Sequence, residues 1–318
     1  MTEITVAEND SGQRLDRFLT KCYPRLTEGR LQKLNRKNCI KLCGKKRPLD
    51  TRLEKGDVIR LYISDELLEK PKARDFREIS GEIDIIYEDE NIILVNKPVG
   101  LVVHEDADNE SDTLINRIKS YLYKSGGYDP DAEQSFAPAL CNRIDRNTCG
   151  IVIAAKNADS LRILSQKIRD RELTKLYLCL AAGNVSPKQA TLTAYLEKNS
   201  DTNTVKITNK KTANNLTIKT AYRVLGFDGE NSLVEVDLLT GRTHQIRAHL
   251  AYIGHPLIGD GKYGSNQINK KYGYKYQALC SYKLIFKFTT DAGRLEYLNG
   301  KEFTAPLPEF AKKFEDKK

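Results

Sequence analysis

The feature that most constrains the fold is a polar stretch followed directly by an apolar run. Residues 142–150 read Asn-Arg-Ile-Asp-Arg-Asn-Thr-Cys-Gly, and residues 151–155 read Ile-Val-Ile-Ala-Ala. A short apolar run that is rich in β-branched residues and bounded by Gly is typical of a strand buried on both faces. The polar stretch is therefore expected to form a loop at the edge of the core, with Asp145 between two Arg residues. Catalytic groups often lie on such loops, but a surface cluster of salt bridges would show the same pattern.

Length and composition set the class of protein. With 318 residues the chain is long enough for a large core, and the usual size of domains predicts two of them. It contains no apolar run long enough to cross a bilayer, and its first residues do not resemble a signal peptide. Seven scattered Cys residues argue against a disulfide framework and favour a reducing compartment. We therefore expect a cytoplasmic protein without a membrane segment.

Almost all of the positive charge lies near the N-terminus. Residues 12–63 contain 15 Lys and Arg against 5 Asp and Glu, a net charge of +10, whereas the whole chain carries +9. The rest of the chain is therefore close to neutral. A basic excess confined to one small region is expected of a nucleic-acid-binding module, although a basic helical domain with a solvated face would have the same composition.

The apolar spacing predicts an α+β fold. Residues 15–22 and 26–34 have helical spacing, and a short hairpin and a strand at 58–63 follow. Residues 64–80 are charged and are expected to be a linker. We expect a mixed, mainly antiparallel sheet with flanking helices at 81–318, preceded by a small basic α/β domain at 12–63. Strands are expected at 83–87, 91–95, 151–155, 176–181, 190–196, 218–225, 233–239 and 276–288, and helices at 113–123, 157–171 and 243–254, the last capped by Thr243.

Two motifs carry a resemblance to a known family. Residues 143–150, Arg-Ile-Asp-Arg-Asn-Thr-Cys-Gly, resemble the catalytic motif of the RluA family of pseudouridine synthases, Arg-Leu-Asp followed by Thr-Ser-Gly. Residues 241–250, Gly-Arg-Thr-His-Gln-Ile-Arg-Ala-His-Leu, and residues 254–260, Gly-His-Pro-Leu-Ile-Gly-Asp, together resemble a second signature of that family. The chain departs from the family pattern at Asn142, where His is most common, at Ile144 and at Cys149.

The resemblance implies isomerisation of uridine to pseudouridine in structured RNA, with large-subunit ribosomal RNA favoured and transfer RNA as the alternative. The family reaction needs neither cofactor nor metal, and we expect a monomer. Asp145 would be the nucleophile, Tyr177 would stack on the uracil, and Arg143 would enter the RNA stack when the uridine is extruded. Because a buried carboxylate needs a nearby cation to stay ionised, we expect Arg242 to pair with Asp145 in the catalytic site.

The basic N-terminal region is expected to supply further RNA contacts. Residues 14–19 and 56–59 resemble the small RNA-binding fold of a small-subunit ribosomal protein (the S4-like fold), which is commonly fused ahead of RluA-type domains. The residues expected to contact RNA in this region are Arg14, Arg17, Arg30, Lys33, Arg36, Lys37, Lys45 and Lys46.

Two other classes of protein are consistent with parts of the sequence. A catalytically silent RNA-binding or ribosome-assembly factor could have the same scaffold, although it would not need the three catalytic residues. A metal-dependent or Cys-dependent hydrolase could use His244, His249 and His255, or Cys149. However, a spacing of five residues puts His244 and His249 about 140° apart around a helix, and Cys149 has no evident base. We therefore expect no metal site.

Overall fold

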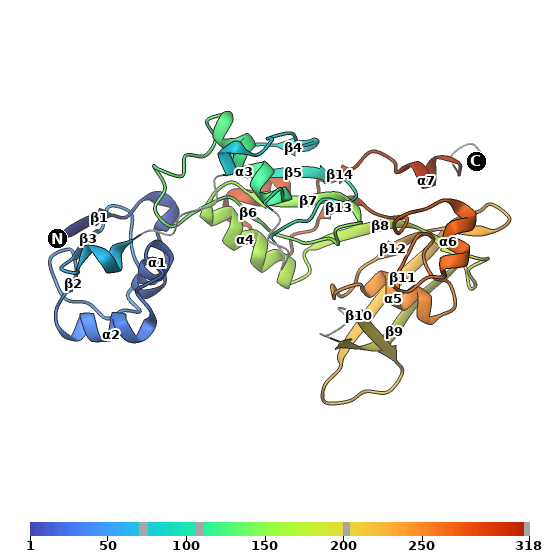
Figure 1. Cartoon of the computed structure of the whole chain (residues 1–318), viewed down its shortest axis with the longest axis horizontal. Coiled ribbons are helices and arrows are strands. Elements are labelled where there is room, and N and C mark those ends of the chain that lie inside the picture. The colour runs from blue at the N-terminus through green and yellow to red at the C-terminus, as the bar shows by residue number, and fades with distance from the viewer. Residues whose placement is uncertain (70–75, 106–110, 200–203, 315–318) are drawn as a thin grey trace. The chain divides into compact units, whose positions relative to one another are not determined.

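The computed structural model describes residues 1–69, 76–105, 111–199 and 204–314 (Figure 1). The chain divides into two compact units that alternate along the sequence. One unit comprises Met1–Glu82, Ile115–Ala139 and Ala155–Arg162, and the other comprises Ile83–Leu114, Leu140–Ala154 and Ile163–Lys318. The domain boundaries expected from the sequence are contiguous and stay predictions, and residues 70–75 of the expected linker lie outside the described residues.

The N-terminal residues of the first unit form a small module with its own core. Its sheet is antiparallel in the order β1-β3-β2, and its apolar core consists of residues between Ile4 and Leu68. Leu15 and Phe18 face this core, as the helical spacing predicts. The elements of this region are β1 (Thr2–Thr5), η1 (Glu8–Asp10), α1 (Leu15–Cys22), α2 (Glu28–Arg36), β2 (Ile40–Leu42), β3 (Val58–Leu61), η2 (Asp65–Leu68) and η3 (Phe76–Glu78).

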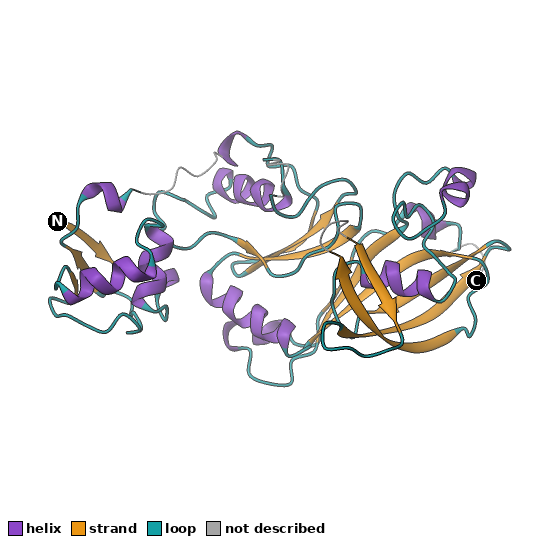
Figure 2. Ribbon diagram, turned by 60° about the horizontal axis from the view of Figure 1, so that its bottom comes forward, coloured by secondary structure: helices purple, strands orange, loops and turns teal. Residues whose placement is uncertain are grey.

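The second unit is built around a large mixed sheet of mainly antiparallel strands, which are among those drawn in orange in Figure 2. Their order is β10-β9-β11-β12-β8-β13-β7-β5-β4, with β14 paired to β13 and β6 to β7. The predicted α+β fold is confirmed. The strands are β4 (Ile85–Glu88), β5 (Ile92–Lys97), β6 (Ala139–Leu140), β7 (Cys149–Ala155), β8 (Leu173–Ala182), β9 (Gln189–Asn199), β10 (Thr204–Thr208), β11 (Leu216–Phe227), β12 (Asn231–Asp237), β13 (Leu279–Phe286) and β14 (Glu302–Thr304).

A parallel pairing inside this sheet places the loop before β7. Strand β13 pairs with β8 in the antiparallel direction and with β7 in the parallel direction. Ser281 of β13 is the register partner of both Tyr177 and Gly150. Gly150 has φ +105°, and a Cβ added there would lie 2.2 Å from the carbonyl oxygen of Ser281, so only Gly fits. This close approach places the polar loop that ends at Gly150 one strand away from Tyr177, on the other side of β13.

One helix of the second unit packs against the large sheet at the second motif. Helix α5 (Gln245–Tyr252) packs against β10 and β11. The sequence predicts Thr243 as the N-cap of this helix, but the N-cap is His244, which has φ 53° in the left-handed region. The reason is a turn in which Gln245 N–H donates to the carbonyl of Arg242 (3.1 Å). The other helices are α3 (Leu114–Lys124), α4 (Ala158–Arg169), α6 (Asn266–Tyr272), η4 (Gly293–Leu298) and α7 (Glu309–Lys312).

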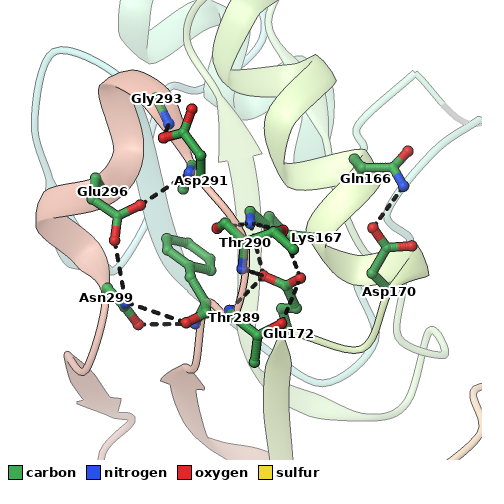
Figure 3. Close-up of polar contacts among 12 residues, drawn as sticks. Gln166, Lys167, Asp170, Glu172, Thr289, Thr290, Asp291, Gly293, Glu296 and Asn299 are labelled. Atoms are coloured by element: carbon green, nitrogen blue, oxygen red, sulfur yellow. Dashed lines mark hydrogen bonds and ion pairs between the residues drawn. The ribbon is translucent and has the colours of Figure 1, made fainter.

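A buried ion pair anchors the beginning of β8 (Figure 3). Lys167 Nζ, near the end of α4, donates to Glu172 Oε2 (2.7 Å) and to Thr290 Oγ1 (2.7 Å). Glu172 also accepts from Thr289 N–H (2.9 Å) and from both threonine hydroxyls. The hydrogen bond from Lys167 lowers the pKa of Glu172 to about 2. The cluster therefore holds the segment after β13 against the residue that directly precedes β8.

The described helices do not include one that is both long and apolar enough to span a membrane.

Candidate active site

A buried Arg holds the carboxylate of Asp145. Arg247 Nη1 donates to Asp145 Oδ2 at 2.9 Å, although the two residues are 102 positions apart. The side chain of Arg247 is 6% exposed and that of Asp145 is 29% exposed. Thr148 N–H donates to the Asp145 carbonyl (3.0 Å), which closes the loop into a turn. The Oδ2 atom of Asp145 is therefore fixed by a buried guanidinium, while the side chain as a whole keeps access to solvent.

Asp260 fixes the orientation of Arg247. Its side chain is fully buried and accepts two hydrogen bonds, from Arg247 Nε (2.7 Å) and Nη2 (2.9 Å). The backbone N–H groups of Lys262 and Tyr263 donate to the same carboxylate (2.8 and 3.1 Å). Burial opposes ionisation of Asp260, but these hydrogen bonds and the charge of Arg247 outweigh it, so the pKa of Asp260 lies below its usual value. Arg247 is thus held on two sides, by one buried and one accessible carboxylate.

The predicted pairing of Asp145 with Arg242 is wrong. Arg242 is exposed in the turn before α5, where its backbone N–H donates to Gln245 Oε1 (3.1 Å). Arg247 lies on α5, where every residue from Gln245 to Leu250 is buried, and it makes the ion pair instead. The sequence does contain a signal for this, because a buried Arg needs a charged partner and Asp260 stands in the same motif. A catalytic role for Arg242 itself stays a prediction.

Tyr177 lies on β8, across β13 from the strand that follows the Asp145 loop. It is 5% exposed and is the register partner of Val236 on one side and Ser281 on the other. Burial raises the pKa of Tyr177 to about 12, with a hydrogen bond involving Ser281 acting against the shift and the charge of Asp145 adding to it. The hydroxyl is therefore protonated at neutral pH and lies within electrostatic reach of the carboxylate.

Lys97, at the end of β5, supports the Asp145 loop from inside. It is fully buried, and its Nζ donates to the carbonyls of Pro98 (2.7 Å), Leu101 (2.8 Å) and Arg146 (2.8 Å). Burial lowers the pKa of Lys97 to about 8, against smaller opposing contributions from Cys149 and Asp145. Arg146 directly follows Asp145, so this amine determines where the backbone of the loop runs. We did not expect this role from the sequence.

The charge state of Lys97 predicts a pH-dependent stability. Its pKa is about 8 in the folded protein and near 10.5 in the unfolded chain, so between these values the unfolded state binds more protons. Stability should therefore rise with pH over this window. We expect Lys97→Met to be less stable than the wild type, because three buried carbonyls lose their donor, and the gap between the two to widen as the pH increases. Urea unfolding at several pH values measures the gap, and a gap that narrows would contradict the prediction.

Four further residues of the two motifs have structural roles, namely Asn142, Cys149, His249 and His255. Asn142 is buried, and its Oδ1 accepts from Ile153 N–H (2.8 Å), so it holds the loop against β7. Cys149 packs beside the apolar cluster under α7. Among the three His residues considered as metal ligands, His249 contacts Thr220 Oγ1 (3.0 Å) and His255 donates from Nδ1 to the Ala182 carbonyl (2.9 Å). In the described part of the chain no group of three His, Cys, Asp or Glu could hold a metal ion.

The third of these His residues, His244, belongs to the site. Its Nε2 lies 3.9 Å from Asp145 Oδ2, and its side chain is 8% exposed. His244 therefore faces the same carboxylate oxygen as Arg247.

The basic residues expected to bind RNA are on the surface. Arg143 is exposed in the loop two residues before Asp145. In the N-terminal module one of them, Arg14, pairs with Asp16 (2.6 Å). All eight candidates of that module are exposed: Arg14, Arg17, Arg30, Lys33, Arg36, Lys37, Lys45 and Lys46.

Comparisons with known proteins identify the family of the chain. The profile of the family described as RNA pseudouridylate synthase matches residues 91–252. The uncharacterized RNA pseudouridine synthase MG370 of Mycoplasma genitalium is 33% identical over 88% of each chain. Ribosomal large subunit pseudouridine synthase D of Borreliella burgdorferi is 32% identical over 82% of this chain and 78% of its own. Among solved structures, human RNA Pseudouridylate Synthase Domain Containing 4 has the same fold, with a TM-score of 0.57 and 24% identity over 71% of this chain and 89% of its own.

The chain belongs to the RNA pseudouridylate synthase family. It is an isomerase that converts uridine in RNA to pseudouridine. The family predicted from the two motifs is thereby confirmed, whereas the S4-like identity of the N-terminal module stays a prediction.

Proposed function

We propose that Asp145 is the nucleophile of the isomerisation. The observation that carries this assignment is the geometry of its carboxylate, in which Oδ2 faces Arg247 and His244. Among the described residues both contacts use the same oxygen, and the side chain is 29% exposed, so we assign the attack to Oδ1. A carboxylate that is held still and partly exposed can form a covalent intermediate, which divides one difficult step into two.

The proposed reaction keeps all atoms of the nucleoside. Asp145 forms a bond to the nucleoside, the bond between the sugar and the uracil nitrogen breaks, and the uracil turns within the site. A carbon–carbon bond to the sugar then forms, the carbon loses its proton, the freed nitrogen gains one, and Asp145 is released. Arg247 orients the carboxylate and stabilises its negative charge. Tyr177 contributes a ring for stacking and, because its pKa is raised to about 12, a protonated hydroxyl.

The target uridine has to leave the RNA stack before Asp145 can reach it. Extruding a base costs roughly a few kcal/mol, which contacts to the flipped base and to its vacated place offset. Arg143 is exposed and lies two residues before the nucleophile. We assign to it the place that the uridine vacates, and we assign phosphate contacts to the exposed cations of the N-terminal module.

We propose large-subunit ribosomal RNA as the substrate, with transfer RNA as the alternative. Support comes from relatives in Borreliella burgdorferi and Vibrio cholerae, which are named ribosomal large subunit pseudouridine synthase D and C. A cytoplasmic location and a monomeric state, both expected from the sequence, stay predictions. The test is to map pseudouridines in total RNA from cells with and without the gene. A site lost only from transfer RNA would overturn the ribosomal assignment.

The proposed role of the N-terminal module predicts a change in salt dependence. Lys33 and Lys37 are exposed at the end of α2. If both contact phosphates, Lys33→Gln with Lys37→Gln should lower the slope of log affinity against log salt by about 0.7–0.9 for each lost contact. The matched control is Lys301→Gln with Lys312→Gln, which removes two exposed cations of the other unit. Affinity measured at several salt concentrations gives both slopes, and equal slopes would contradict phosphate binding by this helix.

A further inference from the structure

Behind Asp145, one tyrosine contacts both groups that face its carboxylate. Tyr263 Oη lies 2.9 Å from His244 Nδ1, and the two rings meet edge to face with centroids 5.6 Å apart. The guanidinium of Arg247 lies over the ring of Tyr263, 5.3 Å from its centroid. Tyr263 N–H also donates to Asp260 Oδ1 (3.1 Å), and Asp260 holds Arg247. These contacts form a closed circuit that begins and ends at the Asp145 carboxylate.

The hydrogen bonds of Tyr263 determine which nitrogen of His244 carries the proton. Val205 N–H donates to Tyr263 Oη (2.9 Å), so this oxygen is already an acceptor. Among the described residues, His244 Nδ1 is the acceptor available to the hydroxyl proton of Tyr263. A hydroxyl that donates to Nδ1 requires an unprotonated Nδ1 and a proton on Nε2. The N–H of His244 is therefore on the nitrogen that faces Asp145 Oδ2.

The surroundings of His244 favour the neutral ring. Burial lowers its pKa, the charge of Asp145 opposes the shift, and Arg247 and Lys262 add to it while Asp260 acts against it. In the described part of the chain, these four charged groups and Tyr263 are the titratable groups that face the ring, and they come from the Asp145 loop, from α5 and from the segment after α5. A neutral ring with its proton on Nε2 follows from both the hydrogen bonds and the charges.

The backbone at His244 is held in an unusual conformation. Its φ of 53° lies in the left-handed region, which residues with a Cβ seldom adopt. Such conformations persist where the surrounding structure imposes them, and they occur often at functional sites. Here the left-handed turn begins α5, and the same turn directs the imidazole into contact with Tyr263 and toward Asp145.

We propose that His244 is a positioning residue for the nucleophile, with its Nε2–H directed at Asp145 Oδ2 and its tautomer set by Tyr263. This inference rests on the proposed role of Asp145. The separation of 3.9 Å exceeds a hydrogen bond, so in the free enzyme the N–H acts on the carboxylate as a dipole. Catalytic hydrogen bonds of free enzymes are often long and tighten when the substrate binds.

A neutral second donor serves the chemistry better than a second cation. Arg247 already supplies one full positive charge at Oδ2. A second charge at the same oxygen would stabilise the free carboxylate further and weaken it as a nucleophile, because catalysis requires stabilisation that increases toward the transition state. A neutral N–H restrains the carboxylate without adding charge. Together the two donors leave Oδ1 as the attacking atom.

Nitrogen NMR of protein labelled in its His side chains tests the tautomer directly. The chain has four His residues, and His244→Gln identifies the signal of His244. We expect a neutral ring with the proton on Nε2 for His244. His255 is an internal reference with a proton on Nδ1, because its Nδ1 donates to a carbonyl (2.9 Å). A proton on Nδ1 of His244, or a charged ring at neutral pH, would overturn the proposal.

A second NMR measurement tests the contact with the nucleophile. Asp145→Asn removes the charge that faces His244, so the Nε2–H resonance of His244 should shift while the Nδ1–H resonance of His255 stays in place. Tyr263→Phe removes the hydroxyl that sets the tautomer, so the His244 signal should change toward a mixture of the two neutral forms. An unchanged His244 spectrum in either variant would show that the contacts among Asp145, His244 and Tyr263 are not as proposed.

Kinetics test whether the contact matters for the reaction. A misplaced reacting group can cost about 100-fold in rate, so His244→Leu should slow the single-turnover step by about that factor while RNA affinity changes little. His244→Gln keeps an N–H near the position of Nε2 and should recover activity to within about tenfold of the wild type. His255→Gln is the matched control and should leave the rate unchanged. Equal rates for the wild type and His244→Leu would overturn the positioning role.

The failure of this inference can be distinguished from failure of the proposed nucleophile. If Asp145→Asn is active, the assignment of the nucleophile is wrong, whatever the state of His244. If Asp145→Asn is inactive but His244 carries its proton on Nδ1, the nucleophile stands and the inference falls. The tautomer is read from the full-length protein without any substrate, so the two results are independent.

Discussion

Asp145→Asn should abolish pseudouridine formation while RNA affinity stays within a few-fold of the wild type. The amide has the size of the carboxylate, and its oxygen can still accept from Arg247 Nη1, which lies 2.9 Å away. It lacks the charge needed for attack on the nucleoside. Removal of a covalent nucleophile typically costs about 10⁴-fold or more. Single-turnover assays on purified variant and wild type, with binding measured in parallel, check both parts of this expectation.

The control for this experiment is another carboxylate of the same unit. Asp84 accepts a hydrogen bond from Asn96 Nδ2 (2.7 Å) on the surface. Asp84→Asn should keep full activity, which separates the loss of the nucleophile from a general effect of removing negative charge. Turnover of the Asp145→Asn variant at more than a trace rate would remove Asp145 from the mechanism.

Arg247→Met should lose both activity and stability. The side chain of Asp260 is fully buried, and its cationic partner is Arg247. Leaving a buried charge without its partner costs about 3–5 kcal/mol. Asp145 also loses the donor that orients it, so the rate should fall as well. Denaturant unfolding and single-turnover rates measure the two effects separately.

A second substitution separates these two effects. In Arg247→Met with Asp260→Asn the buried charge is gone, and the remaining oxygen still accepts from Lys262 and Tyr263. This double variant should regain most of the lost stability, because a buried ion pair can be replaced by neutral groups at little cost, yet it should stay inactive. Arg242→Met is the matched control: Arg242 is exposed, so its unfolding should match the wild type. Recovery of activity together with stability would mean that Arg247 has only a structural role.

Local pattern was sufficient to predict much of this architecture. The apolar run at 151–155 becomes part of β7, and the helical spacing from Leu15 becomes α1, because periodicity reports which side of an element faces the core. The short strand β10 was not predicted, because alternation over so few residues gives little signal. The function was predictable because two motifs resemble a known family, and not because composition or spacing defines a reaction.

The partners of Asp145 could not be predicted from local pattern. Arg242 and Arg247 stand five positions apart in one motif, and only the direction of α5 decides which of them reaches the carboxylate. The same holds for the contact of Lys97 with the Arg146 carbonyl and for that of Tyr263 with Val205, which join distant segments. A pattern of residues shows that charges are present. The packing of strands against helices decides which of them meet.

The central place of β13 has a consequence for the order in which the enzyme can form. This strand is synthesised after β7 and β8, yet it lies between them in the sheet. Until it is inserted, both strands have open edges, a state that favours aggregation, and the loop of Asp145 lacks its neighbour Ser281. A chain that stops before Leu279 would contain Asp145, Tyr177 and Arg247 and still have no assembled site. Catalytic competence should therefore appear only once β13 has been made and inserted, and a break within β13 should inactivate an enzyme whose reacting groups are all intact.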